Sequence, residues 1–306
     1  MTTRIDLSPL KPPSQPLTPS QSIFLSIFDN ALTWSPNPQT ASTQIAYDLR
    51  NLFIETRSIS VTQGLLPDLW KILLDILSII PIDHPWQHAV IISIRRLQAI
   101  PSEIVFLPDH NLFWCNLPGL SEYFYSRWQD ITEDQSLYKV ENINLHTRLT
   151  SFASQLLSPT YLNFLPLCYQ TLRSALETPP QLSWQTNSVY ETKFWVATEV
   201  LVRSAPLLFR DMTQSPTLTT QSEEMISVGP LCQGNFYERS IERWNYWREK
   251  MSRMVKGIGG DVLGKGRDFP PPEEVSEIKK RIFELCLRGL NAIDYAEGGR
   301  EGVSDP

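Results

Sequence analysis

The fold class is decided by residues 65–101, which read LLPDLWKILLDILSIIPIDHPWQHAVIISIRRLQAIP. Pro81 divides this stretch, because proline has no N–H for the helical hydrogen bond and ends a helix. Beyond it, Asp83 is a candidate N-cap and Pro85 stands in the first turn of a second helix. The short link predicts that the two helices form an antiparallel pair. Before Pro81, apolar side chains recur at the period of a helix face, at Leu69, Ile72, Leu73, Ile76, Leu77 and Ile80.

The same helical period continues on both sides of this stretch. No alternating strand pattern longer than four residues and no internal repeat is present. The sequence therefore predicts an all-α fold, a single multi-helix domain of roughly nine to ten antiparallel-packed helices over residues 19–296. Besides the first pair, one helix is expected to begin at Pro19. Further helices are expected over residues 39–57, 119–129, 141–157, 160–177, 187–211, 238–256 and 273–296.

Four segments are expected outside this helical body. Residues 1–18, rich in Pro, Ser and Thr, and residues 297–306 lack an apolar stripe, so both are predicted to be disordered tails. The polar run 213–227 and the glycine-containing run 257–272 are predicted to be loops.

Composition excludes several classes of partner. The chain has 306 residues, and its 42% hydrophobic and 20% charged content is typical of a soluble globular protein. It carries 27 Lys and Arg against 33 Asp and Glu, without a strongly basic segment, so no nucleic-acid partner is expected. The most apolar stretch, residues 69–80, contains Lys71 and Asp75 and is too short to span a bilayer, so no membrane is expected either.

Cysteine usage and the first residues indicate the compartment. The amino-terminal segment has no apolar region of the kind found in a secretory signal, and no two cysteines form a CxxC pair. Free thiols in a reducing environment, and a cytoplasmic location that can extend to a nuclear one, are therefore expected. The isolated cysteines are Cys115, Cys168, Cys232 and Cys286.

Two patterns resemble cofactor sites but lack essential parts. Residues 259–265, GGDVLGK, match the start of a phosphate-loop pattern, yet Gly266 replaces the hydroxyl residue and a helix precedes the segment. We interpret it as a flexible linker. His84 and His88 stand four apart on one helix, and Asp83 could add a carboxylate, but no further ligand cluster accompanies them. The sequence therefore predicts no metal and no other cofactor.

The most individual segment is RSIERWNYWR, residues 239–248. Helical spacing brings Arg243 near Trp247 and Trp244 near Arg248, where cation–π contacts can form. In the favoured interpretation the tryptophans face the core, while the arginines reach carboxylates on neighbouring elements. In the alternative, Arg243, Trp244, Trp247 and Arg248 form an exposed recognition patch.

Several segments, taken in order, identify a family resemblance. They are the stretch from Leu69 to Pro101, then LRSALE (172–177), GPLCQG (229–234) and RWNYW (243–247), followed by an amphipathic helix. Over about residues 40–296 the chain resembles a fungal family of domains of unknown function, DUF3632. The resemblance implies a helical fold and a fungal source, and it brings no activity, catalytic residue or cofactor.

Details of these segments qualify the resemblance. Gln155 stands where the family pattern leads us to expect arginine, and residues 257–266 resemble an insertion. If that arginine pairs with a buried acid in the family, the pair is altered here. Within LRSALE, Arg173 and Glu177 stand four apart, which favours an ion pair on one helix face and a structural role for the carboxylate.

Two functions remain open after this reading. The leading hypothesis is a helical scaffold or binding protein that holds a protein or small-molecule partner without catalytic chemistry. The alternative is an enzyme or accessory protein of fungal secondary-metabolite biosynthesis, acting through an apolar pocket lined by aromatic residues of 106–128 and 190–209. A closed cavity with converging polar groups would favour the enzyme, and a filled interior would favour the binding protein.

Overall fold

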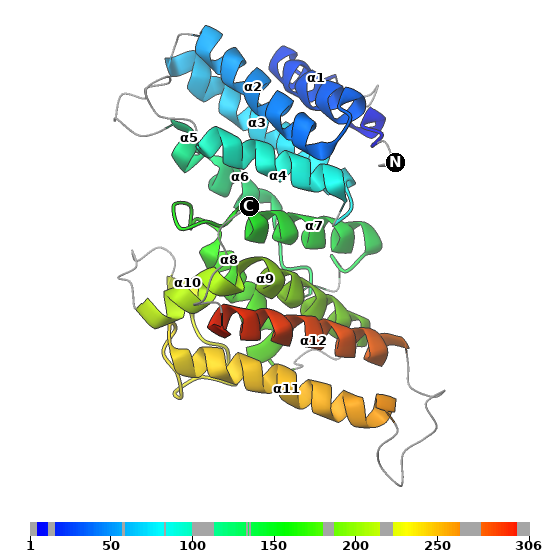
Figure 1. Ribbon diagram of the computed structural model, residues 1–306, viewed down its shortest axis with the longest axis vertical. Coiled ribbons are helices and arrows are strands. Elements are labelled where there is room, and N and C mark those ends of the chain that lie inside the picture. The colour runs from blue at the N-terminus through cyan, green and yellow to red at the C-terminus, as the bar shows by residue number, and fades with distance from the viewer. Residues whose placement is uncertain are drawn as a thin grey trace. The chain divides into compact units, whose positions relative to one another are not determined.

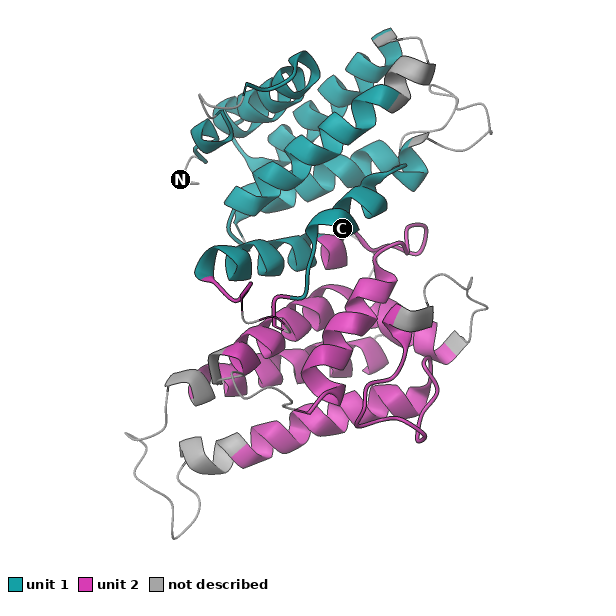
Figure 2. Cartoon of the chain, turned by 180° about the vertical axis from the view of Figure 1, so that it is seen from behind, with its two compact units in different colours: residues 1–130, 140–152 teal, residues 131–139, 153–306 magenta. Residues whose placement is uncertain are grey.

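The described part of the chain is helical (Figure 1). In it the structure has no β-strand, only an isolated bridge between Ser158 and Tyr161. The predicted all-α class is therefore confirmed. The contacts divide the chain into two compact units, Met1–Asp130 with Val140–Phe152, and Ile131–Lys139 with Ala153–Pro306 (Figure 2). This computed structural model describes residues 5–11, 16–56, 59–82, 84–99, 113–132, 134, 136–179, 187–214, 223–263 and 277–298.

The first unit is built around the stretch that decided the fold class. All six apolar residues of the stripe over 69–80 are fully buried, as their spacing predicts. Helix α1 packs on α2 and α3, α2 packs on α4, and α3 packs on α6. The helices of this unit are α1 (Pro19–Trp34), α2 (Pro38–Thr56), α3 (Ile59–Ile79), α4 (Pro85–Gln98), α5 (Phe113–Asn116), α6 (Leu120–Arg127) and most of α7 (Val140–Leu156).

Part of the amino-terminal segment packs on this unit. Leu7 is buried at 2% exposure, beside the short 3₁₀ helix Ser8–Leu10, and Lys11 pairs with Asp29 on α1 at 2.9 Å. A disordered tail was predicted over residues 1–18 because no apolar stripe is present. Burial of one leucine and one ion pair is enough to place residues 5–11, whereas residues 1–4 and 12–15 lie outside the described residues.

The link between α3 and α4 differs in detail from the prediction. The N-cap of α4 is His84, whose Nδ1 accepts a hydrogen bond from the Trp86 N–H at 3.2 Å. The expected cap, Asp83, lies outside the described residues. The main partner of α4 is α2, for example through Arg96 and Thr43, whereas the short link had suggested α3. A short link keeps consecutive helices near each other, but the apolar faces of all neighbours decide which pair packs closely.

The titratable side chain of His146 is buried in this unit. His146 on α7 is 5% exposed, its Nδ1 lies 2.9 Å from the Gln129 carbonyl oxygen, and its ring lies 5.4 Å from that of Trp128. Burial lowers the pKa of His146, although Asp130 and the Gln129 carbonyl favour its charged form. The imidazole is therefore held neutral in the folded protein at neutral pH.

This burial predicts a pH-dependent stability. Because the folded-state pKa lies below the unfolded value of about 6.5, the unfolded chain binds more protons between the two, and stability falls as pH drops below about 6.5. His146→Gln should make the urea midpoint less dependent on pH between about pH 8 and about pH 5.5. The matched control is His88→Gln, because His88 is exposed on α4. An equal pH dependence in His146→Gln and the unaltered protein would contradict this account.

The second unit is built from three long helices that lie side by side, α9, α11 and α12 (Figure 1). Gly289 lets α12 approach closely, because a Cβ there would lie 2.9 Å from the Met251 sulfur and 3.4 Å from Leu201 Cδ1. The helices of this unit are α8 (Leu165–Leu172), the π-helical turn η3 (Arg173–Glu177), α9 (Asn187–Gln214), α10 (Glu223–Ile226), α11 (Ile241–Leu263) and α12 (Glu277–Gly298).

The structure differs from the sequence prediction at two helix boundaries in this unit. The helix expected over 160–177 is α8 followed by a π-helical turn, which widens the backbone at Arg173–Glu177. Helix α11 continues to Leu263, where a loop was expected from Gly257. Glycine lowers helix propensity without forbidding the conformation, and no proline interrupts residues 257–263.

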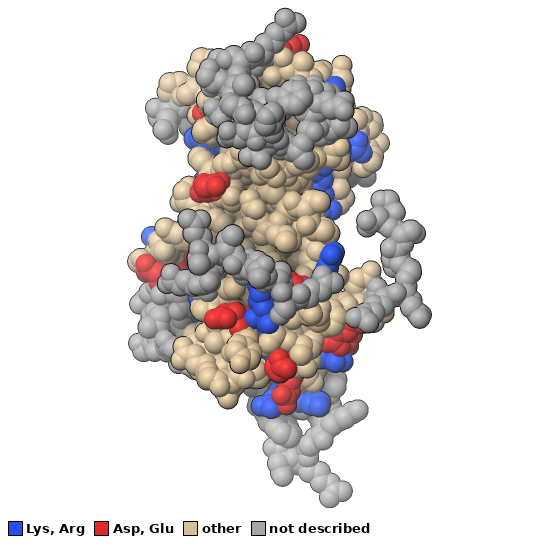
Figure 3. All heavy atoms as spheres, turned by 90° about the vertical axis from the view of Figure 1, so that its left-hand side faces the viewer, with Lys and Arg blue, Asp and Glu red and all other residues tan. Residues whose placement is uncertain are grey.

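The described surface carries both signs of charge. On the face drawn in Figure 3, basic and acidic side chains are interspersed over a mainly uncharged surface. None of the helices in the described ranges is long and apolar enough to cross a bilayer.

Candidate functional site

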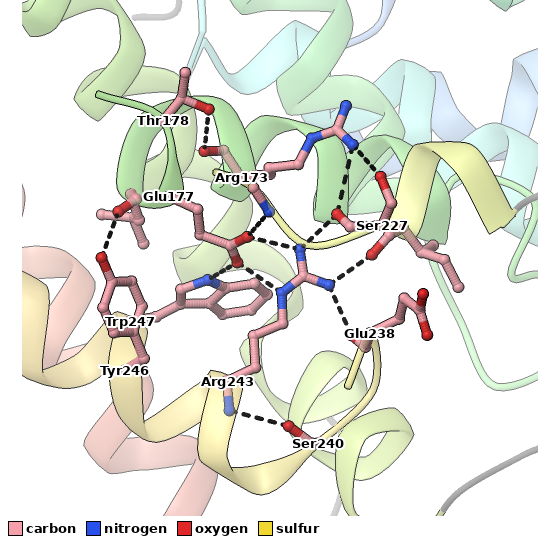
Figure 4. Close-up of polar contacts among 12 residues, drawn as sticks. Arg173, Glu177, Thr178, Ser227, Glu238, Ser240, Arg243, Tyr246 and Trp247 are labelled. Carbon is pink, nitrogen blue, oxygen red and sulfur yellow. Dashed lines mark hydrogen bonds and ion pairs between the residues drawn. The ribbon is translucent and has the colours of Figure 1, made fainter. Parts of the chain in front are cut away.

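Three segments singled out in the sequence meet at Glu177 in the second unit (Figure 4). Glu177 is the last residue of the π-helical turn, and its side chain is fully buried. Arg243 and Trp247 come from the first turns of α11, and Gly229 comes from the loop between α10 and α11. LRSALE, GPLCQG and RWNYW thus each supply at least one group to the same cluster.

Four N–H groups surround the Glu177 carboxylate. Arg243 donates from Nε to Oε1 at 2.6 Å and from Nη2 to Oε2 at 3.2 Å. The Trp247 indole N–H donates to Oε1 at 2.5 Å, and the Gly229 backbone N–H donates to Oε2 at 2.5 Å. A buried carboxylate is tolerated only when it is paired and hydrogen-bonded, and here both of its oxygens have two donors.

Arg243 is equally enclosed. Its Nη1 donates to the carbonyl oxygens of Ile226 at 2.6 Å and Glu238 at 2.7 Å, and Nη2 donates to that of Ser227 at 3.1 Å. The guanidinium carbon lies 5.2 Å from the centroid of the Trp247 ring, so the cation–π contact expected between them is confirmed. Arg243 therefore ties both ends of the connection between α10 and α11 to Glu177.

Gly229 has a steric role in this cluster. A Cβ at this position would lie 2.6 Å from Glu177 Cβ and 2.9 Å from the Glu177 carbonyl oxygen. That carbonyl accepts the Leu231 N–H at 3.0 Å, so the loop and the π-helical turn are in backbone contact. Only a residue without a side chain fits between them.

Gly229→Ala should therefore lower the free energy of unfolding by about 1–3 kcal/mol, because the loop must move away from Glu177. The matched control is Gly257→Ala in α11, where nothing lies within 4 Å of the added Cβ. That change should be neutral or should stabilise the helix by up to about 1 kcal/mol. Urea midpoints measure both effects, and equal midpoints for the two variants would rule out the close approach.

A second buried acid lies beside the first. The Tyr169 hydroxyl donates to Asp211 Oδ2 at 2.6 Å, and Arg239 Nε lies 3.2 Å from the same oxygen. Burial raises the pKa of Asp211, while Tyr169 and Arg239 oppose the shift. Burial and the Asp211 charge raise the pKa of Tyr169, so this hydroxyl stays a proton donor. The Tyr169 ring lies 6.0 Å from the Trp247 ring, which joins the two clusters.

Comparison with protein families identifies the region that holds these clusters. The sequence model of DUF3632, described as a protein of unknown function, matches residues 70–251, more than half of the chain. The chain belongs to this family. Comparisons with curated proteins and with solved structures found no match. The matched range of this DUF3632 protein contains every residue of the Glu177 cluster, whereas α12 lies beyond it.

The four residues of the candidate recognition patch are placed differently from one another. Arg243, Trp244 and Trp247 are fully buried, which is the placement that the core interpretation expects. The Arg248 side chain is 46% exposed and pairs with Asp294 and Glu297 on α12, each at 2.9 Å. The indole N–H of Trp244 also donates to Glu297 Oε1, at 2.8 Å. Of the four, only Arg248 reaches the surface, so the four together do not form one exposed patch in this DUF3632 protein.

Sequence reasoning missed most partners of Glu177. The spacing in LRSALE predicted Arg173 as the ion-pair partner of Glu177. In the structure, the Nη1 of Arg173 contacts the Ser227 hydroxyl. The ion pair of Glu177 that the structure shows is with Arg243, 66 residues along the chain. The buried carboxylate could have been suspected from the glycine in GPLCQG and the arginine in RWNYW, but nothing in the sequence links those segments to Glu177.

Three of the four cysteines are buried, and one of the two histidines considered for a metal site caps a helix. Burial raises the thiol pKa of Cys168, Cys232 and Cys286 to about 12, so these thiols stay protonated at neutral pH. His84 caps α4, and no three His, Cys, Asp or Glu residues in the described part of the chain could share a metal ion. In GGDVLGK, residues 259–263 continue α11, and Gly264 and Lys265 lie outside the described residues.

Two hollows open to the described surface of this DUF3632 protein. In the first unit, one of about 480 Å³ lies between α3 and α6, beside Trp70, Glu122 and Tyr123. In the second unit, a groove of about 470 Å³ lies between α9 and α12. Both are open grooves with mainly apolar walls, unlike the closed aromatic-lined cavity considered for an enzyme. The polar side chains of the α9–α12 groove are Arg203, Arg288, Asn291 and Tyr295.

Proposed function

We propose that this DUF3632 protein is a helical binding protein that holds a small molecule without transforming it. The observation that carries the proposal is the contrast between its buried acids and its open grooves. Glu177 and Asp211 are enclosed by protein groups, whereas the grooves are accessible and mainly apolar. Accessible apolar hollows with a few polar groups are typical of ligand sites.

The Glu177 cluster suits a structural role better than acid–base catalysis. A general acid or base must come within hydrogen-bonding reach of its substrate. The Glu177 side chain has no exposed surface, and both carboxylate oxygens already accept two hydrogen bonds. A substrate could reach it only after the loop between α10 and α11 had moved and the buried ion pair had been opened.

The size of the α9–α12 groove favours a small ligand over a protein partner. A stable protein interface buries roughly 800 Å² on each partner, and ligand pockets enclose about 300–1,000 Å³. The groove of about 470 Å³ lies within the second range. The proposal also includes a fungal source, supported by the sequence resemblance, and a cytoplasmic or nucleocytoplasmic location, supported by the free cysteines.

A ligand screen tests this function. Purified protein is heated with panels of neutral, cationic and anionic small molecules, and compounds that raise the melting temperature are recovered after long incubation and weighed by mass spectrometry. We expect at least one chemical class to stabilise the protein and to be recovered unchanged. Heat-denatured protein is the control for spontaneous reaction. Conversion of a stabilising compound would favour the alternative, an enzyme of fungal secondary metabolism, and stabilisation by no class would contradict small-molecule binding.

A further inference from the structure

The lining of the groove between α3 and α6, in the first unit, points to a class of ligand. We propose that this groove binds a primary or secondary amine, in its ammonium form, with a compact aryl or branched alkyl body. The inference rests on the proposed function, because it names the site and the ligand of the binding protein. Two observations carry it, the mainly apolar walls of the groove and the exposed carboxylate of Glu122 among its lining residues.

The floor and walls of this groove are apolar. Trp70 on α3 is 1% exposed and forms the floor, and its indole N–H donates to the Pro118 carbonyl oxygen at 2.8 Å. Gly119 leaves room above this ring. Its φ of 80° favours glycine, and a Cβ there would lie 3.7 Å from Trp70 Nε1. Leu66 and Pro67 of α3 add apolar surface, and the volume of about 480 Å³ is that of a small-molecule site.

The polar side chains of the groove leave an acceptor without a donor. The Trp70 N–H is already bonded, and the Ser126 hydroxyl donates to the Tyr123 carbonyl oxygen at 2.7 Å. The Glu122 carboxylate accepts one hydrogen bond in the described part of the chain, from the Ser121 hydroxyl to Oε2 at 3.0 Å. Its Oε1 is therefore open to a ligand, and that ligand must donate a hydrogen bond.

The charge of Glu122 favours an ammonium group as this donor, because hydrogen bonds between charged groups are roughly twice as strong as neutral ones. Lys71 and Arg127 lie on the same two helices, but both pair with Asp75, at 2.9 Å and 2.5 Å, and neither lines the groove. The first turn of α6 has backbone N–H groups without helical partners, which by themselves favour an anion. Glu122 stands in that turn, so its carboxylate would repel an anion bound there.

An amine with an apolar body complements both parts of the groove. A metal cation or a free ammonium ion would leave the apolar walls uncovered, and a hydrocarbon would leave Glu122 without a donor. A quaternary ammonium ligand would carry the charge without an N–H group. The ammonium group of a primary or secondary amine supplies charge and donor together, and its hydrocarbon part covers Leu66, Pro67 and Trp70.

Calorimetric titration of the full chain at neutral pH tests the assignment. The probes are 4-phenylbutylamine, its trimethylammonium derivative, the matched alcohol 4-phenylbutan-1-ol and the acid 4-phenylbutyrate. We expect the amine to bind at least about tenfold more tightly than each of the other three, because only the amine donates a charge-assisted hydrogen bond to Glu122. Equal affinity for the alcohol would overturn the ammonium assignment, and equal affinity for the trimethylammonium derivative would overturn the need for an N–H donor. Equal or tighter binding of the acid would overturn the sign of the charge.

Two groove variants and one control locate the site. Glu122→Gln should weaken 4-phenylbutylamine binding about tenfold or more and leave binding of the alcohol nearly unchanged, because the amide keeps the shape of the side chain and removes its charge. Glu141→Gln is the matched control and should change neither affinity. Glu141 is exposed in the first turn of α7, as Glu122 is in that of α6, and it does not line the groove.

The second groove variant, Ser126→Phe, tests the shape of the site. A helical side chain extends over the turn that precedes it, so this ring should cover the groove while Glu122 is kept. Binding of both the amine and the alcohol should fall at least about tenfold, and the circular dichroism spectrum should not change, because Ser126 is exposed. Binding of the amine that survives either groove variant at full strength would overturn the site.

The outcome is separable from that of the proposed function. If 4-phenylbutylamine does not bind, the ligand assignment is wrong. If another compound from the screen still stabilises the protein and is recovered unchanged, the binding function stands without it. If no compound stabilises the protein, both are wrong.

Discussion

Arg243→Met is expected to lower the free energy of unfolding by about 3–5 kcal/mol, because it leaves the buried Glu177 carboxylate without its counter-charge. Arg243 supplies two of the four donors to that carboxylate, and it also holds the carbonyl oxygens of Ile226 and Glu238. Methionine fills a similar length of the cavity and replaces none of these hydrogen bonds. The urea midpoint at neutral pH measures the change.

Two further variants separate charge from packing. Arg253→Met is the matched control, because Arg253 pairs with Glu249 at an exposed position of the same helix and should contribute no more than about 0.5 kcal/mol. Adding Glu177→Gln to Arg243→Met removes the unpaired charge. The double variant should regain about 1–3 kcal/mol of the free energy of unfolding that Arg243→Met loses. A double variant no more stable than Arg243→Met alone would show that the charge is not the source of the loss.

Trp247→Ala is expected to lower the free energy of unfolding by about 3–5 kcal/mol, because removal of a large buried ring leaves a cavity that the surrounding helices cannot fill. The ring is fully buried, lies 6.0 Å from Tyr169 and 6.2 Å from Trp244, and carries one of the hydrogen bonds to Glu177. We expect the variant to be largely unfolded or insoluble at ordinary temperature, and a urea midpoint measured on any soluble fraction gives the loss.

Trp247→Phe divides this loss into two parts. Phenylalanine retains most of the ring contacts and lacks the N–H, so its cost should be about 1–3 kcal/mol, that of a buried acceptor without one donor. Tyr237→Ala is the control, because Tyr237 is 82% exposed and its removal should change stability by no more than about 0.5 kcal/mol. An unchanged midpoint for Trp247→Ala would place the ring outside the core and restore the interpretation of this helix as a recognition surface.

The helices were predictable because their signal is local. The apolar stripe over 69–80 repeats at the helical period, and the structure buries each of its members. Proline by itself did not mark helix ends. Pro81 follows the end of α3 as expected, whereas Pro67 lies inside α3 and Pro206 inside α9, in stretches where the periodicity predicts helix. Tertiary packing can offset the loss of one helical hydrogen bond, so a proline breaks a helix only where its neighbours do not hold it.

The chemistry of the candidate site could be predicted only in part. Helical spacing brought Arg243 to Trp247, because residues four apart share a face of a helix. The same rule applied to Glu177 led to Arg173 and did not point to Arg243. The groove between α9 and α12 had no sequence signal, because its two walls come from helices separated by the whole of α10 and α11.

The sequence by itself determined the all-α class, most helix positions and the family, because each depends on short-range periodicity or on the order of segments. Only the tertiary structure decided that LRSALE, GPLCQG and RWNYW meet at one carboxylate, that the tryptophans of α11 are buried, and that two arginines line an open groove. The reason is physical: periodicity shows which face of a helix is apolar, whereas the partner of a buried charge is set by which distant segments that face packs against.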